Sequence, residues 1–153
     1  MRHLLIFSLI LASVFAGSNL EITSDDFLYK DGDNKATFIG NVVATQKKNI
    51  IKSDKLIVFL DSDNEAKKYK AIGNVYFEIS NDKKDINGTC HTLTYLPKED
   101  KYILVGNVKM EDRRNSRKVF GDEIIIDNKK GTSYANSKSK KPVKFIFKVK
   151  SQK

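Results

Sequence analysis

The sequence is poor in the residues on which most catalytic and metal chemistry depends. It holds one cysteine, two histidines and no tryptophan in 153 residues. Cys90 has no partner for an internal disulfide, and we expect it to be a small buried side chain. Cys90 and His91 are adjacent on a predicted strand, so they point to opposite faces and cannot together bind zinc. We find no catalytic constellation, metal site, nucleotide motif or cofactor motif, and predict that the protein is not an enzyme.

The sequence also lacks a hydrophobic run long enough to span a bilayer comfortably. Its one long apolar run, Leu4–Phe15, follows Arg2 and is shorter than the roughly 20 residues that a membrane helix needs. Val14 and Ala16 suit the −3 and −1 positions of a signal-peptidase site. We therefore predict a signal peptide over residues 1–16, cleaved after Ala16, and an exported protein. An uncleaved anchor is the alternative.

The net charge is strongly basic, with 28 Lys and Arg residues against 19 Asp and Glu residues. In the cytosol such a charge would first suggest a nucleic-acid partner. Export argues against nucleic acid and favours an anionic lipid, glycolipid or membrane surface. Most of these lysines are nevertheless expected to be part of an ordinary solvated surface.

A Gly-Asn-Val signature recurs at an even interval along the chain. It begins at Gly40, Gly73 and Gly106, which are 33 positions apart, and each copy ends a run with alternating apolar residues. A fixed period that contains an alternation of two predicts stacked β units within one all-β domain. We assign this domain to residues 17–141.

A second motif, which contains an aspartate, alternates with the first. It is present at 24–29, 53–59 and 121–126, and a weaker copy at 90–95 has Cys90-His91 in place of Ser53-Asp54. We expect Asp25, Asp54 and Asp122 to lie where a strand begins and to bond the local backbone, without a ligand role.

The alternation predicts which side chains point inward. One face of the strands is apolar in every repeat, and the opposite face is mostly polar. The predicted inward residues that we single out are Phe38, Val42, Ala71, Val75, Phe77, Leu104, Val108 and Met110. We expect the repeated glycines to lie within this face and to crease the sheet around a groove, although a plain packed sandwich could be creased in the same way.

The C-terminal residues 142–153 form a separate basic strand and tail in this interpretation. Apolar residues alternate there with mostly basic ones; the apolar residues are Val143, Phe145, Phe147 and Val149. An edge strand of this kind could pair with a partner strand. Its lysines could equally protect the edge against aggregation.

Together, these features resemble the OstA-like family of lipopolysaccharide transport proteins. The most specific pieces are residues 36–45, Ala-Thr-Phe-Ile-Gly-Asn-Val-Val-Ala-Thr, and the Ser-Asp-Lys-Leu that follows at 53–56. The resemblance covers the chain from about Leu20 to the tail. It implies a twisted, slightly open β-jellyroll in the periplasm, whose apolar lining accepts the acyl chains of lipopolysaccharide (lipid A).

The resemblance also implies partners. Jellyrolls of this family join edge to edge, which would place Phe27 and Tyr29 at one joining edge and Val143, Phe145, Phe147 and Val149 at the other. The partners would be an LptC-type jellyroll at the inner membrane, an LptD-type jellyroll at the outer membrane, and further copies of this chain in a head-to-tail homo-oligomer. Two alternatives remain open: a membrane-anchored LptC-type subunit, and an envelope interaction module with a dry, fully packed interior.

Overall fold

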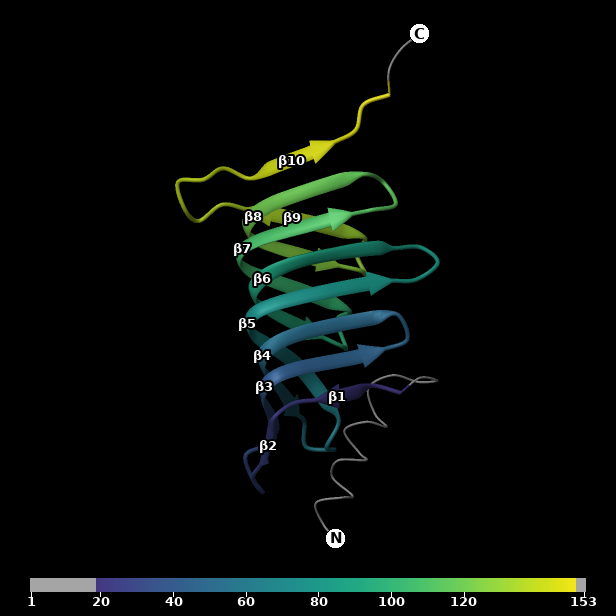
Figure 1. Ribbon diagram of the computed structural model, residues 1–153. Coiled ribbons are helices and arrows are strands. Elements are labelled where there is room, and N and C mark those ends of the chain that lie inside the picture. The colour runs from purple at the N-terminus through teal and green to yellow at the C-terminus, as the bar shows by residue number, and fades with distance from the viewer. Residues whose placement is uncertain (1–18, 151–153) are drawn as a thin grey trace.

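The chain folds into one continuous antiparallel β-sheet (Figure 1). The structure is a computed structural model that describes residues 19–150, so the predicted signal peptide lies outside the described residues. Within that range the strands are β1 Glu21–Thr23, β2 Asp26–Tyr29, β3 Lys35–Gln46, β4 Asn49–Leu60, β5 Ala66–Ser80, β6 Asp85–Leu96, β7 Lys101–Asp112, β8 Arg117–Asp127, β9 Thr132–Asn136 and β10 Lys144–Phe147. None of these residues forms a helix that could cross a membrane.

The long strands β3 to β8 follow one another as a meander, each paired with the next. Their hairpin turns contain residues with positive φ, among them Asn64, Asp100 and Ser116. Asn and Asp tolerate this left-handed backbone better than other side chains, which explains the turn-rich composition between the strands. The two ends of the sheet are split: β1 and β2 both pair with β3, and β9 and β10 both pair with β8.

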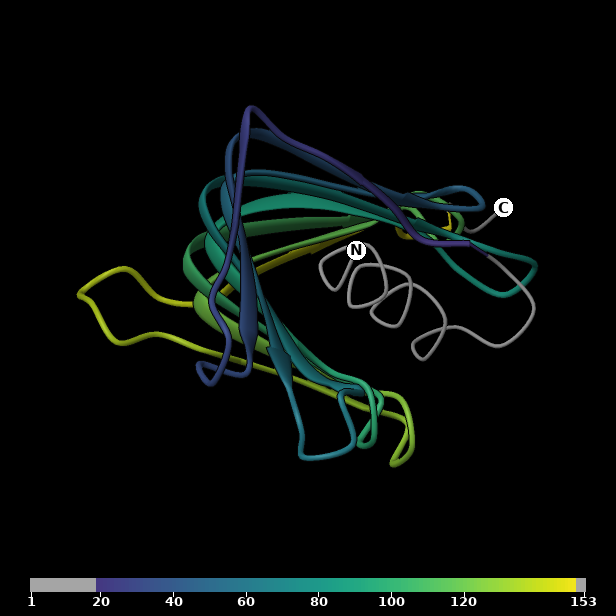
Figure 2. The same ribbon diagram turned by 90° about the horizontal axis from the view of Figure 1, so that it is seen from below.

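Every long strand bends at the same level, so the sheet folds into two arms. The register shifts between Ile39 and Val42, and the same shift recurs 33 residues later in β5 and again in β7. Seen from below, the two arms diverge from the bend (Figure 2). We call the halves at 35–39, 55–60, 66–72, 92–96, 101–105 and 123–127 the first arm, and those at 42–46, 49–53, 75–80, 85–90, 108–112 and 117–121 the second arm. The predicted all-β, creased stack is confirmed.

Asp25 immediately precedes β2, as expected, but the position expected for the other two aspartates was wrong. Asp54 lies in the middle of β4 and Asp122 in the middle of β8, both at the bend. The Oδ2 atom of Asp54 accepts a 2.9 Å hydrogen bond from Nδ2 of Asn74 on the next strand. The same bond joins Asp25 to Asn41. The bend makes room for a carboxylate between strands, so these side chains bond across the sheet and not only to local backbone.

Two of the three repeat glycines make room for this contact, and their missing side chains do not point in the expected direction. Gly73 has φ +86°, and a Cβ added to it would lie 2.6 Å from the Asp54 carboxylate. Gly40 stands in the same relation to Asp25. The missing side chain therefore faces the neighbouring strand's aspartate at the outer bend and not the interior. Only glycine combines this backbone conformation with so close an approach.

Candidate functional site

Two cross-strand rows of apolar residues line the inner face of the sheet from one edge to the other. The row on the first arm is formed by Phe27, Phe38, Leu56, Ala71, Leu93, Leu104, Ile124 and Ala135. The row on the second arm is formed by Ile22, Ala44, Ile51, Phe77, Gly88, Met110, Val119 and Phe145. We call these the first apolar row and the second apolar row. They face the space between the arms, so the groove has no polar side chain along either row.

The structure brings together the residues for which a lining role was predicted. Seven of the eight are fully buried on the inner face, namely Phe38, Val42, Ala71, Val75, Phe77, Leu104 and Val108. Met110 is only partly buried and packs against the same cluster. Their common orientation follows from the strand alternation, which the paired bends leave unchanged on both arms.

Gly88 explains how the largest of these side chains fits. It faces Phe77 in the second apolar row, and a Cβ there would lie 2.7 Å from the ring's Cζ atom and 2.3 Å from the carbonyl oxygen of Lys109. The absence of a side chain at Gly88 therefore opens the space that the Phe77 ring occupies. The sequence pattern did not predict that residues 85–89 contribute to the lining.

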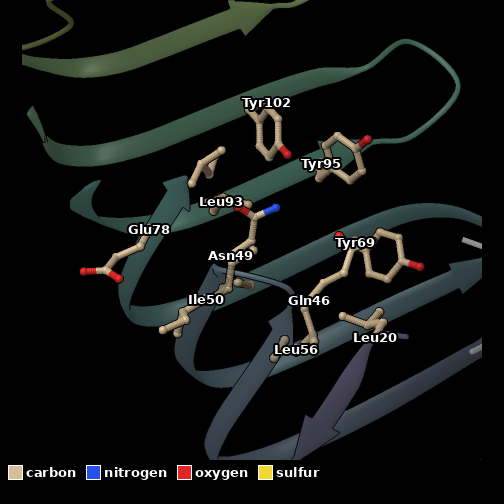
Figure 3. Close-up of a pocket in the computed structure, with 14 residues that line it drawn as sticks. Leu20, Gln46, Asn49, Ile50, Leu56, Tyr69, Glu78, Leu93, Tyr95 and Tyr102 are labelled. Atoms are coloured by element: carbon tan, nitrogen blue, oxygen red, sulfur yellow. The ribbon is translucent and has the colours of Figure 1, made fainter. Parts of the chain in front are cut away.

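A ladder of tyrosines lies beside the first apolar row, toward the mouth of the groove. Tyr69, Tyr95 and Tyr102 pair in register on β5, β6 and β7. Their ring centroids are 6.2 Å and 4.5 Å apart. Figure 3 shows the three rings on successive strands around a pocket that Leu20 and Ile50 also line. Each such aromatic contact contributes roughly 0.5–1.5 kcal/mol beyond area burial.

The tyrosine ladder adds hydroxyl groups to the groove but no charge. Burial raises the pKa of Tyr95 to about 12, and burial also raises the pKa values of Tyr69 and Tyr102. All three phenols are therefore neutral at physiological pH. Their inward direction could be predicted from the alternation, but their stacking could not, because it depends on the strand register.

Apolar side chains are exposed on the edge strands at both ends of the stack. Phe27 on β2 is 46% exposed, and on β10 Phe145 and Phe147 are 50% and 57% exposed. Tyr29 lies on the same edge strand as Phe27 but is partly buried against the core. The predicted C-terminal strand is shorter than expected, since Val143 and Val149 flank β10 and are exposed outside it.

The one cysteine among the described residues is not a reactive group. Cys90 is buried and free, and burial raises the pKa of its thiol to about 12, so the thiol stays protonated. Unreactive buried thiols behave as small hydrophobic side chains. Among residues 19–150, no cluster of His, Cys, Asp and Glu is arranged to hold a metal ion.

Comparison with known proteins identifies the family of the chain. The family described as "LptA/(LptD N-terminal domain) LPS transport protein" matches residues 21–132. The chain belongs to this family.

The solved structure of LptH, the LptA homologous periplasmic component of the lipopolysaccharide transport device of Pseudomonas aeruginosa, superposes with a TM-score of 0.73. The alignment covers 85% of this chain and 95% of LptH at 17% sequence identity. At that identity the superposition establishes the OstA-like jellyroll fold alone. No curated protein sequence matches.

Proposed function

We propose that this LptA-like protein binds lipopolysaccharide by its acyl chains in the groove between the arms and carries it across the periplasm. The observation that carries the proposal is the pair of apolar rows, which cross the sheet from one edge to the other without a polar side chain. A lining of this kind contacts acyl chains without fixing them at one point. Membership of the lipopolysaccharide transport family supports the same cargo.

The energetics explain why such a cargo needs a continuous lining. Burying one methylene is worth roughly 0.8 kcal/mol, so one 12-carbon chain exposed to water costs on the order of 10 kcal/mol. Lipid A carries several chains, so it does not diffuse freely through the periplasm. A row of similar apolar side chains offsets this cost evenly along the stack, whereas one deep pocket would retain the lipid.

The bridge itself would form by edge-to-edge joining. The edge at β1 and β2 and the edge at β9 and β10 each leave backbone groups that a further strand can pair with. Joining the β9–β10 edge of one jellyroll to the β1–β2 edge of another would continue both apolar rows across the junction. The first row would run from Ala135 to Phe27 of the next jellyroll, and the second from Phe145 to Ile22. The proposed partners are an LptC-type jellyroll, an LptD-type jellyroll and a second copy of this chain.

Binding of purified lipopolysaccharide tests the cargo. The protein, isolated after export, is mixed with lipopolysaccharide, and complexes are separated by native gel electrophoresis and analysed for bound lipid by mass spectrometry. We expect a stable complex that survives removal of free lipid. A folded protein that retains no lipid would contradict the proposal and favour an envelope interaction module.

The N-terminal residue of the isolated protein separates a free bridge from an anchored subunit. A first residue of Gly17 in the soluble periplasmic fraction would support the free bridge. Retention of Met1 in the membrane fraction would contradict it and favour the anchored LptC-type alternative.

A further inference from the structure

A second cavity lies at the mouth of the groove, where the two arms approach each other. Its volume is about 420 Å³, within the range typical of ligand pockets. The second arm contributes Asn49, Ile79 and Ile86 and the β5–β6 turn, whereas the first arm contributes Tyr102, Ile126 and the turns after β6 and β8. The cavity is thus enclosed by both arms and adjoins the apolar lining through Tyr102.

The lining of this cavity combines apolar and polar side chains. Apolar side chains, Ile79, Ile86 and Ile126, form part of the wall. The polar part holds Lys83 and Lys84 together with the amides of Asn49, Asn81 and Asn128. Apolar side chains next to two ammonium groups suit an amphiphile with an anionic head group.

Most lysines in residues 19–150 form no ion pair, and the two cavity lysines are among them, whereas three others are paired. Lys98, Lys118 and Lys138 each lie 3.8 Å from an aspartate or glutamate. Within residues 19–150, neither Lys83 nor Lys84 forms an ion pair. Asp100, the carboxylate in the cavity wall, accepts a 3.1 Å hydrogen bond from Nδ2 of Asn128 instead.

Lys84 also connects the arms. Its Nζ atom donates a hydrogen bond to Oδ1 of Asn128 on the opposite side of the mouth. An amide oxygen is neutral, whereas a phosphate oxygen is anionic, so a bond from the ammonium group to phosphate adds the attraction between opposite charges. A phosphate that entered the cavity could therefore replace Asn128 as the acceptor.

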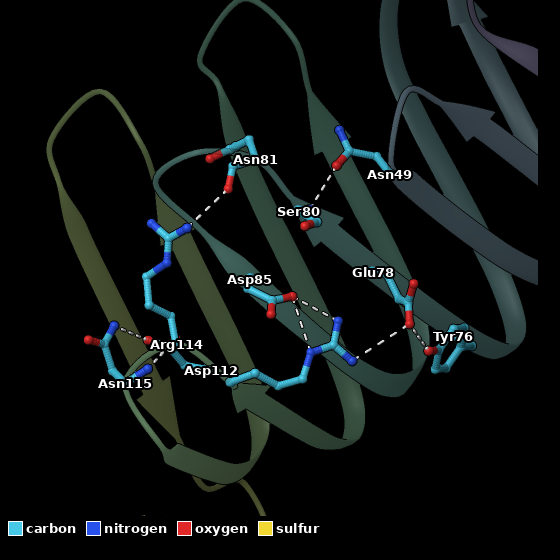
Figure 4. A network of polar contacts seen from close by, with 10 residues as sticks. Asn49, Tyr76, Glu78, Ser80, Asn81, Asp85, Asp112, Arg114 and Asn115 are labelled. Atoms are coloured by element: carbon cyan, nitrogen blue, oxygen red, sulfur yellow. Dashed lines mark hydrogen bonds and ion pairs between the residues drawn. The ribbon is translucent and has the colours of Figure 1, made fainter.

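The turn that presents the lysines is held in place from two sides (Figure 4). Inside the turn, Oδ1 of Asn81 accepts hydrogen bonds from the backbone N–H groups of Lys83 and Lys84. From the neighbouring turn, Arg114 donates to the backbone carbonyls of Asp82 and Asn81. A turn fixed in this way loses little entropy when its lysines bind a ligand.

We propose that this mouth cavity binds a phosphate group on the sugar head of the lipid whose acyl chains lie in the groove, with Lys83 and Lys84 as the phosphate ligands. The inference rests on the proposed function and deepens it: the groove takes the chains, and the cavity takes the anionic head. It predicts that the phosphate groups of the cargo contribute to its binding through this cavity, so unphosphorylated glycolipids bind more weakly.

The test compares two lipids and four forms of the exported protein, the wild type and three variants. Binding of diphosphorylated lipid A and of its fully dephosphorylated counterpart is measured for the wild type, for Lys83→Ala with Lys84→Ala, and for Lys140→Ala with Lys141→Ala. The last pair removes the same charge from an exposed loop far along the chain. Asn128→Ala removes the opposite acceptor and keeps both lysines. Circular dichroism establishes that each variant is folded.

The expected results separate this inference from the proposed function. The Lys83 and Lys84 variant should bind the phosphorylated lipid on the order of tenfold more weakly and lose discrimination against the dephosphorylated one. The Lys140 and Lys141 variant and Asn128→Ala should keep the wild-type preference. Equal weakening by both lysine pairs, or an unchanged preference in the Lys83 and Lys84 variant, would overturn the phosphate site while leaving lipid binding intact.

A competition experiment with inorganic phosphate identifies the source of the phosphate. Excess inorganic phosphate should compete only weakly with lipid A, because the apolar chains supply most of the binding free energy. Complete competition by inorganic phosphate would overturn the glycolipid assignment. Failure of the wild type to bind either lipid would instead refute the proposed function itself.

Discussion

Nδ2 of Asn74 on β5 lies 2.9 Å from Oδ2 of Asp54 on β4, directly beside the glycine that precedes Asn74. The same contact joins Asn41 to Asp25 at the start of the stack. The repeat in the sequence is therefore a repeat of one contact, in which a glycine admits a carboxylate and an asparagine bonds it. This contact recurs at the bend between the two arms, so the bend has its origin in the sequence repeat.

Replacing a repeat glycine should destabilise the bend more than replacing a turn glycine with a similar backbone. Gly32 has φ +92° and open space around it, whereas Gly73 has φ +86° and faces Asp54. We expect Gly32→Ala to cost about 1–2 kcal/mol in the free energy of unfolding, the cost of a left-handed backbone. Gly73→Ala should cost about 1–3 kcal/mol more because of the clash. Urea denaturation measures both, and equal costs would contradict the close-contact explanation.

The third repeat lacks the carboxylate, since His91 stands beside Gly106. His91→Asp should supply an acceptor for the Asn107 amide and raise the free energy of unfolding by about 1 kcal/mol. His91→Ala is the control, because it removes the ring without adding an acceptor. The gain should disappear in an Asn107→Gly background, where glycine keeps the positive φ of 46°. A gain that persists without the Asn107 amide would contradict the proposed bond.

The aspartate of the fourth motif copy, Asp122, should hold the loop before β10. Asp122 accepts hydrogen bonds from the backbone N–H groups of Lys138 and Ser139, at 2.6 Å and 2.7 Å. Hydrogen bonds from Ser139 and Lys138 hold the pKa of Asp122 below its usual range. A lowered pKa means that this stabilisation is present above the pKa of an unfolded aspartate and is lost as the pH falls through the folded value.

Two measurements check this attachment. An NMR titration of the Ser139 amide should report a pKa below the ordinary aspartate value of about 3.9. At pH 8, Asp122→Asn should speed tryptic cleavage in the loop after Lys138 and Lys140, whereas Asp33→Asn in the β2–β3 turn should leave that rate unchanged. An ordinary pKa together with an unchanged cleavage rate would show that the loop is held by other contacts.

The exposed edge phenylalanines should govern joining of jellyrolls. Phe145 continues the second apolar row, whereas its neighbour Ile146 is similarly exposed on the other face of β10. We expect Phe145→Asp to reduce head-to-tail association, measured by analytical ultracentrifugation, and Ile146→Asp to leave it nearly unchanged. The backbone edge is the same in both variants. Equal loss in both would mean that the apolar rows do not continue across the junction.

The alternation in the sequence was sufficient to predict the inner face, because a strand buried on one side encodes that side in every second residue. Phe38, Phe77 and Leu104 are buried accordingly. The crease was predictable from the glycines, but the partner of each glycine was not. Asp54 reads as the start of a strand, since aspartate favours turns and caps, and only the bend at Gly73 and Asn74 shows why it lies mid-strand.

The mouth cavity had no signal in the sequence. Lys84 and Asn128 are 44 residues apart in two different turns, and their contact depends on how far the two arms close. The tyrosine ladder could be predicted in part from the sequence. Its members face inward by alternation, but the 4.5 Å contact between Tyr95 and Tyr102 requires the register of β6 against β7.

In-cell photocrosslinking tests the central claim, lipid carriage on the inner face, most directly. A photoreactive phenylalanine analogue is placed at Phe77 or Met110 in the second apolar row, and at Lys109 on the opposite face of β7 as the control. We predict lipopolysaccharide adducts at Phe77 and Met110 and none at Lys109. An exported, folded protein without adducts at the two inner positions, or with equal labelling at Lys109, would contradict the account.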